Sequence, residues 1–312
     1  MRAPLISPIR RMRPVSMRPE PPQAGENLRG AGLMTLSMVS FASNDTVMKF
    51  VTQEMPLYQA IFLRGLVVVI FLIALAYRKG GRLRRPQGKD RGRMALRVVG
   101  EVGSTILFLN ALQHMAIGDL SAIMQSLPLV VMVAAAIFLG ESLGWRRTLA
   151  ALVGLIGVLI ILRPGGESFG IWSLTAIGAM LMVTLRDLST RRFSAQVTTT
   201  TVSFYAACAV LLTGAVGMAF QGWVTPSLSQ LGLLLLSGAF LTVGYLSAVS
   251  AMRIGEISYV APFRYTSLLV AIIAGLLVFG EWPDLWTWVG AGLVVSAGIY
   301  TILRESQLGW RR

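Results

Sequence analysis

The chain has 312 residues, of which 54% are apolar and only 13% carry a charge. A water-soluble domain needs roughly 25% charged residues, so the composition excludes an ordinary soluble protein and predicts a surface that faces lipid. The net charge of +14 is concentrated in the tail and in short gaps between apolar runs. No long basic face with interleaved aromatic residues is available, and we expect no nucleic-acid partner.

The first 28 residues are rich in arginine and proline and precede the first apolar run. They contain no apolar segment of the kind that a cleavable signal peptide needs. We therefore expect 1–28 to be a disordered basic cytoplasmic tail, of which part is absent if translation begins at Met12 or Met17.

Ten apolar runs follow, each with roughly the 20 residues that a helix needs to cross the hydrocarbon core of a membrane. Their continuous pattern favours helices over the alternating strands of a β-barrel. The predicted spans are 30–50, 57–77, 95–115, 119–139, 147–163, 169–187, 199–220, 229–252, 256–279 and 284–303.

The basic residues predict the orientation of these spans. With the N-terminus inside, 24 of the 28 Lys and Arg residues fall on the cytoplasmic side, whereas Lys49 and Arg163 fall outside and Arg64 and Arg264 lie within spans. Such an excess is typical of cytoplasmic loops. We expect a multi-pass protein of a bacterial-type cytoplasmic (inner) membrane, with both termini in the cytoplasm.

Two motifs occur twice along the chain. Ile117–Ser121 is echoed by Ile254–Ser258, and Phe138–Glu141 is echoed by Val278–Glu281. Because each copy belongs to a set of five helices, an odd number, the second set must enter the membrane upside down. The pattern predicts an all-α integral membrane protein with ten transmembrane helices as two inverted five-helix repeats, at 29–163 and 164–305, followed by a short cytoplasmic tail at 306–312.

The duplicated motifs also indicate a family. The matching pieces are Ala116–Ser121 with Pro128, Gly140–Glu141, Ile254–Ser258, Ala261–Pro262, Gly280–Glu281 and Arg64 in Phe62–Arg64. Their order, spacing and duplication resemble the EamA-type domain of the drug/metabolite transporter superfamily over about residues 30–305. The resemblance implies two inverted repeats around a central cavity that opens to one side of the membrane at a time, with a small molecule as substrate.

Two segments point to one branch of that superfamily. Ser43–Thr46 with Lys49, and Ala261–Thr266, resemble the branch that includes S-adenosylmethionine and riboflavin transporters. Substrates differ widely across such a fold, so the resemblance alone does not select one.

Arg64 and Arg264 are the first candidates for substrate contact. An arginine within a span is costly unless it faces a cavity or a partner, and its guanidinium group suits a carboxylate or phosphate. Phe263 and Tyr265 flank Arg264 and are added to the predicted site. The alternative role of both arginines is an internal ion pair that fixes packing.

Asp45 and Lys49 lie four residues apart, on one face of the predicted first helix, where they can pair. Asp45 could instead take up a proton and couple it to substrate movement, or pair with Arg64. We predict Asp45 and Lys49 as coupling or ion-pair residues, and the neighbouring Asn44 as a substrate-binding residue.

Four other polar or amphipathic residues lie within apolar spans, where they line a cavity or bond helix to helix. They are Asn110, Gln125, Tyr205 and Tyr245. Pro128 and Pro262 interrupt the fourth and ninth spans and could free backbone groups to line a site. Glu101 is expected to pair with Arg97, and Glu141 and Glu281 to cap or pair near the membrane surface.

The leading functional hypothesis is a secondary active transporter of a small organic metabolite, coupled to protons or to exchange. No phosphate-binding G-x-x-x-x-G-K-[ST] loop occurs, and one cysteine and one histidine cannot build a thiol- or imidazole-rich metal site. We expect no metal, no cofactor and no catalytic residue. The alternatives are a membrane-embedded group-transfer enzyme that acts on a lipid-linked substrate, and a receptor or scaffold. A homodimer is left open.

Overall fold

The computed structural model describes residues 24–78, 86–139, 145–163, 170–194, 197–254 and 260–309. Within these ranges every regular element is a helix. The elements are α1 (Ala24–Val51), α2 (Leu57–Arg78), α3 (Lys89–His114), α4 (Ile117–Met124), α5 (Leu127–Leu139), α6 (Trp145–Leu162), α7 (Ile171–Arg191), α8 (Thr199–Gln221), α9 (Leu228–Ile254), η1 (Ala261–Tyr265), α11 (Thr266–Ala274), η2 (Gly275–Phe279) and α12 (Leu285–Gly309).

Two of the predicted spans are interrupted. The fourth is divided into α4 and α5 next to Pro128, and the ninth begins with the 3₁₀ helix η1, which contains Pro262. Counting each interrupted span once, the described helices make ten successive segments, as predicted. Six candidate spans are long and apolar enough to cross a membrane, and three shorter apolar helices accompany them.

The ends of the predicted elements differ in two places. The first helix begins at Ala24, inside the predicted tail, and α12 continues to Gly309, inside the predicted C-terminal tail. Two segments close with a glycine in the left-handed region, Gly222 (φ 82°) after α8 and Gly280 (φ 66°) after η2. Glycine adopts this conformation without steric cost. Glu141 and Glu256 lie outside the described residues.

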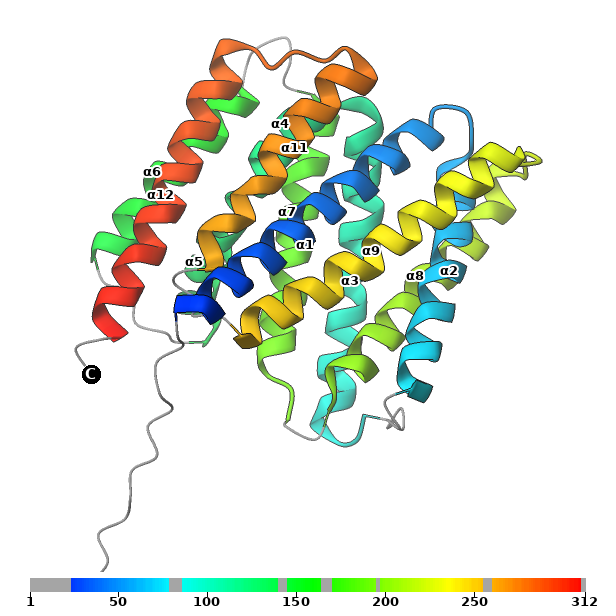
Figure 1. Cartoon of the computed structure of the whole chain (residues 1–312), viewed down its shortest axis with the longest axis horizontal. Helices are drawn as coiled ribbons and strands as arrows, with labels where there is room; N and C mark the ends of the chain where they lie inside the picture. Colours follow the sequence, from blue (N-terminus) through cyan, green and yellow to red (C-terminus); the bar gives the residue numbers. More distant parts are fainter. Residues whose placement is uncertain are drawn as a thin grey trace, which may run out of the picture.

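The connections lie at two opposite faces of the bundle. At the first, here called the Lys49 face, Gln59 hydrogen-bonds the backbone of Val224, and Gln113 donates to the carbonyl of Thr52. At the second, the Asp90 face, the hydroxyl of Ser194 donates to Asp90 over 2.5 Å. Successive segments therefore alternate in direction between the two faces (Figure 1).

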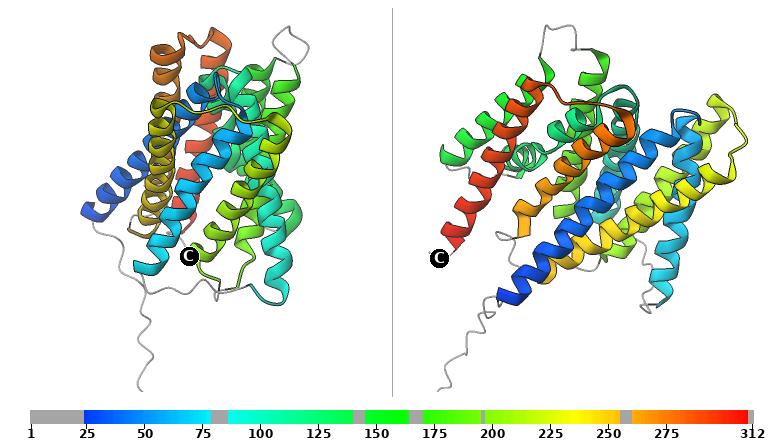
Figure 2. Two further views of the ribbon diagram at one scale, coloured as in Figure 1. Left: turned by 90° about the vertical axis from the view of Figure 1, so that its right-hand side faces the viewer. Right: turned by 45° about the horizontal axis from the view of Figure 1, so that its top comes forward.

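The closest helix pairs join elements that are far apart in sequence. They are α1 with α9, α3 with α7, α6 with α12, and α2 with α8. In Figure 1, α1 runs beside α9, and in Figure 2 the red α12 lies along the green α6.

The main hydrophobic core lies toward the Lys49 face. Its largest fully buried members include Met48, Leu112, Ile117 and Leu120. They come from the last turns of α1 and α3 and from α4, so this face is densely packed.

Candidate functional site

A cavity of about 240 Å³ lies among α1, α2, α3, α7, α8 and α9, with a contact from the end of α4. Its α3 wall runs from Arg97 to Leu109 and its α8 wall from Ser203 to Val210. The lining residues of α7, α8 and α9 lie in the halves of these helices nearer the Asp90 face, whereas those of α2 and α3 extend across the middle of the bundle. A concave site with a mostly apolar wall and a few polar groups is typical of small-molecule binding.

The first polar cluster of the wall is centred on Asn44, at the α1 side. Arg64 NH1 in α2 donates to Asn44 Oδ1 over 3.4 Å, and the hydroxyl of Ser237 in α9 donates to the same oxygen over 2.8 Å. The amide nitrogen of Asn44 donates to Asp45 Oδ1 over 2.9 Å. Asn44 thus connects a guanidinium group to a carboxylate.

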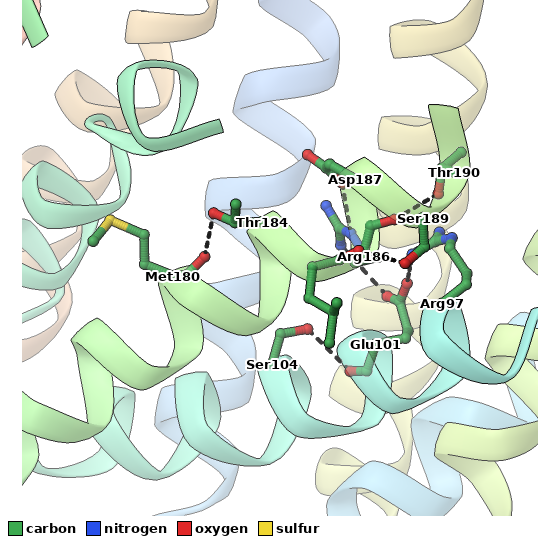
Figure 3. A network of polar contacts seen from close by, with 10 residues as sticks. Arg97, Glu101, Ser104, Met180, Thr184, Arg186, Asp187, Ser189 and Thr190 are labelled. Atoms are coloured by element: carbon green, nitrogen blue, oxygen red, sulfur yellow. Dashed lines mark hydrogen bonds and ion pairs between the residues drawn. The ribbon is translucent and has the colours of Figure 1, made fainter. Parts of the chain in front are cut away.

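The second cluster is centred on Glu101 in α3 (Figure 3). One carboxylate oxygen lies 2.6 Å from Arg97 NH1, and the other lies 3.6 Å from Arg186 NH1 in α7. Arg186 Nε also lies 2.9 Å from Asp187 Oδ1. Glu101 therefore joins α3 to α7 at the cavity wall, and the predicted pair between Arg97 and Glu101 is present.

Gly100 explains why α7 comes so close to Glu101. A Cβ atom at Gly100 would lie 2.8 Å from the backbone nitrogen of Arg186 and from the carbonyl oxygen of Met182. Only a residue without a side chain permits this approach of two helix backbones. The next residue along α3 is Glu101, which is thereby brought to Arg186.

The two clusters give the wall three arginines and two carboxylates in largely apolar surroundings. Charges cost several kcal/mol when they are removed from water, and in a membrane protein they usually face a cavity or a partner. The Glu101 cluster consists of charges that pair with one another. The Asn44 cluster does not: among the described residues, neither Asp45 nor Arg64 has an ion-pair partner within 4.0 Å.

Four of the predicted site residues line the cavity: Asn44, Asp45, Arg64 and Tyr245. Tyr245 lies edge-on to Phe41, with ring centroids 5.3 Å apart. These residues come from α1, α2 and α9, so the structure brings together parts of the sequence that the chain keeps far apart.

Three other predicted residues are not among those that line the cavity. Asn110 donates to the carbonyl of Ile106 within α3, and Gln125 donates to the hydroxyl of Ser267 over 2.6 Å. Gln125 therefore joins the interruption of the fourth span to the start of α11. Tyr205 packs edge-on against Phe204. Asn110 therefore bonds within its own helix, Gln125 bonds to another helix, and Tyr205 packs against its neighbour in α8.

Arg264 and its neighbours also lie outside the cavity wall. Arg264 and Phe263 are exposed in η1, and Tyr265 is buried, with a hydroxyl group that has no hydrogen-bond partner among the described residues. The sequence pattern places Arg264 well inside the ninth span. The described part of that segment begins at Val260, and it places Arg264 in the 3₁₀ helix η1 with an exposed side chain.

Lys49 forms an ion pair with Glu281 and not with Asp45, which was one of the alternatives that the sequence left open. Lys49 Nζ lies 2.5 Å from Glu281 Oε1 and donates to the carbonyl of Met115. Helical spacing makes the contact between Asp45 and Lys49 available, but Glu281 is brought to the end of α1 by the chain reversal before α12. The expectation that Glu281 pairs near the membrane surface agrees with this contact.

Sequence reasoning missed the role of three cavity residues. Glu101 and Arg97 were expected only to pair with one another, and Arg186 was counted with the cytoplasmic basic residues. A signal was present: Arg186 and Asp187 are adjacent charges within the predicted span 169–187. The i, i+4 spacing of Arg97 and Glu101 gives no indication that α7 lies beside them.

Comparison with known proteins agrees with the architecture. The model of the EamA-like transporter family matches residues 28–163 and, a second time, residues 170–304. A protein of known crystal structure shares the fold with a TM-score of 0.63 and 18% identity, over 88% of this chain and 96% of the other.

Curated relatives are named as transporters or exporters. An S-adenosylmethionine uptake transporter of Rickettsia felis is 26% identical, over 90% of this chain and 94% of the relative. A riboflavin transporter of Rhizobium johnstonii is 27% identical over 94% and 96%. A pseudopaline exporter of Pseudomonas aeruginosa is 25% identical over 86% and 94%. The chain is therefore a multi-pass membrane protein that belongs to the EamA-like transporter family of the drug/metabolite transporter superfamily.

Proposed function

We propose that the protein is a secondary active transporter that carries a small organic metabolite through the cavity by alternating access. The observation that carries this proposal is the cavity of about 240 Å³, which is lined by charged groups. Five of the helices that enclose it, α2, α3, α7, α8 and α9, are long and apolar enough to cross a membrane. Buried charges at such a depth usually serve a solute pathway. The transporter names of the relatives support a carrier over the group-transfer enzyme.

The helix packing supports two inverted repeats. Each of the ten segments has a counterpart five places along the chain. The counterparts of α1 and α9 are α7 and α3, and α1 contacts α9 just as α7 contacts α3. α2 is the counterpart of α8, and α6 is the counterpart of α12, and the two members of each pair are in contact. Because five is an odd number of segments, each counterpart runs through the bundle in the opposite direction. We take the two halves to rock against each other around the cavity.

The conformation corresponds to a carrier that is closed at the Lys49 face. The core cluster fills that half of the bundle, and the pair between Lys49 and Glu281 lies at its edge. The cavity lies in the middle of the bundle and extends toward the Asp90 face along α7, α8 and α9. If the basic residues set the termini in the cytoplasm, this is the state that faces the cytoplasm of a bacterial-type inner membrane.

Uptake into proteoliposomes tests the proposal. Purified protein is reconstituted and assayed with labelled S-adenosylmethionine, riboflavin and amino acids, with and without a pH gradient. Saturable accumulation that collapses with a protonophore would support proton coupling, and flux only with preloaded solute would support exchange. No flux of any solute, in vesicles shown to hold folded protein, would contradict a carrier.

A matched pair of variants links flux to the cavity. Ala207 lines the cavity from α8, whereas Leu212 of the same helix is 64% exposed and is expected to face lipid. Ala207→Trp should fill part of the cavity and abolish flux, and Leu212→Trp should leave flux unchanged. Equal flux from the two variants would place the pathway elsewhere.

A further inference from the structure

Asp45 and Arg64 carry opposite charges, face the same cavity and do not form an ion pair. They extend from different helices, α1 and α2, and both are hydrogen-bonded to the side chain of Asn44. The Glu101 cluster shows the usual alternative, in which a carboxylate contacts arginines directly. The separation of Asp45 from Arg64 therefore needs a structural cause.

Asn44 is that cause. Its side chain is 3% exposed, and its oxygen accepts from Arg64 and from Ser237 while its nitrogen donates to Asp45. The amide stands between the guanidinium group and the carboxylate. A direct pair would require Asn44 to give up hydrogen bonds in a buried position, where unmade hydrogen bonds are costly.

Both charged groups keep unused hydrogen-bonding capacity. A guanidinium group has five N–H donors, and Arg64 makes one long hydrogen bond of 3.4 Å among the described side chains. Asp45 accepts one hydrogen bond, from Asn44, at one of its two oxygens. Both residues line the cavity, so a set of donors and a separate charged acceptor are presented to a solute.

We propose that Arg64 and Asp45 form a subsite for a zwitterionic head group, with the substrate's carboxylate on Arg64 and its ammonium group on Asp45. The chemical class is the α-amino acids and derivatives that keep both groups. Guanidinium binds carboxylate with parallel hydrogen bonds, and a carboxylate accepts from ammonium. The rest of the solute would lie against Phe108, Leu109 and Val210 of the apolar wall. This inference rests on the proposed function, because it takes the cavity as the substrate site.

Binding to purified full-length protein in lipid nanodiscs tests the proposal without transport. The probes are S-adenosylmethionine and the free amino acids methionine, leucine, phenylalanine and tryptophan. Each free amino acid is compared with its N-acetyl derivative, which keeps the carboxylate, and with its methyl ester, which keeps the ammonium group. We expect a zwitterion of the set to bind at least about tenfold tighter than either derivative, since a hydrogen bond to a charged group contributes at least that factor. No binding by any zwitterion, or equal binding by its derivatives, would overturn the proposal.

Single variants assign each charge to its partner. Asp45→Asn should weaken the zwitterion about 10- to 100-fold and leave the N-acetyl derivative unchanged, and Arg64→Gln should weaken the zwitterion equally and leave the methyl ester unchanged. Arg192→Gln is the control, since Arg192 is exposed and bonds the carbonyl of Phe138 outside the cavity.

The double variant Asp45→Asn with Arg64→Gln guards against misfolding, because it leaves no uncompensated buried charge. It should elute as folded protein and bind the zwitterion as weakly as either single variant or more weakly. Zwitterion binding at the wild-type level in the folded double variant would overturn the subsite.

Transport data separate this inference from the proposed function. Flux of riboflavin, with no binding of any zwitterion, would overturn the subsite and leave a carrier. Tight zwitterion binding that depends on Asp45 and Arg64, with no flux of any solute, would support the subsite and contradict transport.

Discussion

Lys49 Nζ lies 2.5 Å from Glu281 Oε1, and this contact joins the end of α1 to the residues just before α12. The side chain of Lys49 is only 6% exposed. The second oxygen of Glu281 accepts from the backbone nitrogen of Ile117 over 2.9 Å, at the start of α4. One carboxylate thus holds three segments together at the Lys49 face.

Glu281→Gln should destabilise the protein because it leaves the Lys49 ammonium group buried without a counter-charge. Loss of one partner of a buried pair costs about 3–5 kcal/mol; we expect about 2 kcal/mol, since Glu281 keeps 27% exposure and part of the pair is solvated. Thermal unfolding in detergent would measure it. The double variant Lys49→Met with Glu281→Gln should be more stable than the sum of the single changes, and simple additivity would contradict the pairing.

Glu101→Gln should uncouple α3 from α7. The change removes the negative charge that lies 2.6 Å from Arg97 and 3.6 Å from Arg186. Arg186 keeps Asp187, whereas Arg97 loses its ion-pair partner. We expect a coupling energy of about 1–3 kcal/mol between positions 101 and 186 in a double-mutant cycle with Arg186→Gln, measured by thermal unfolding. A coupling energy near zero would show that the pair contributes no net stability.

Asn44→Ala should lower substrate affinity more than turnover. Without the amide, Arg64 and Asp45 are free to pair with one another and withdraw from the solute. We expect KM to rise about tenfold, in keeping with one lost charged hydrogen bond, with kcat less affected. Ser37→Ala is the control: Ser37 is also buried on α1, but it donates to the carbonyl of Gly244 and does not line the cavity. Equal effects of the two variants on KM would contradict the role of Asn44.

Gly100→Ala should disturb the contact between α3 and α7. The added methyl group would lie 2.8 Å from two backbone atoms of α7, and overpacking of this kind costs about 1–3 kcal/mol. Gly92→Ala in the same helix meets nothing within 4 Å and should be neutral or stabilising by up to about 1 kcal/mol, because alanine favours a helix more than glycine does. Thermal unfolding of the two variants should therefore move in opposite directions.

Arg264→Ala should retain transport, since the side chain is exposed and lies outside the cavity wall. Arg64→Ala should lose transport by at least about tenfold, because it removes a charged donor from the wall. Flux in proteoliposomes, normalised to the amount of folded protein, would measure both variants. A larger loss with Arg264→Ala would mean that the ninth segment contacts the substrate, as the sequence pattern predicts.

Several features of the fold could be predicted from the sequence because they depend on residues that lie close together in the chain. Apolar runs of spanning length predict helices, and Pro128 and Pro262 mark the two interrupted segments, since proline lacks the amide hydrogen of a helix interior. The duplicated motifs around Asp119 and Glu281 indicate the family, which the two matches of the family model confirm. Arg64, Asp45 and Asn44 stand out because a polar group within a span needs a cavity or a partner.

The sequence by itself determined that the chain is a helical membrane protein of this family, because hydrophobic length and motif order are properties of short segments. The tertiary structure decided which charges meet: Lys49 pairs with Glu281 rather than with Asp45, Arg186 reaches Glu101, and Arg264 stays outside the cavity. Helical spacing fixes only neighbours within one helix. Contacts such as α1 with α9 and α3 with α7 join distant segments, and their partners depend on how all the helices pack together.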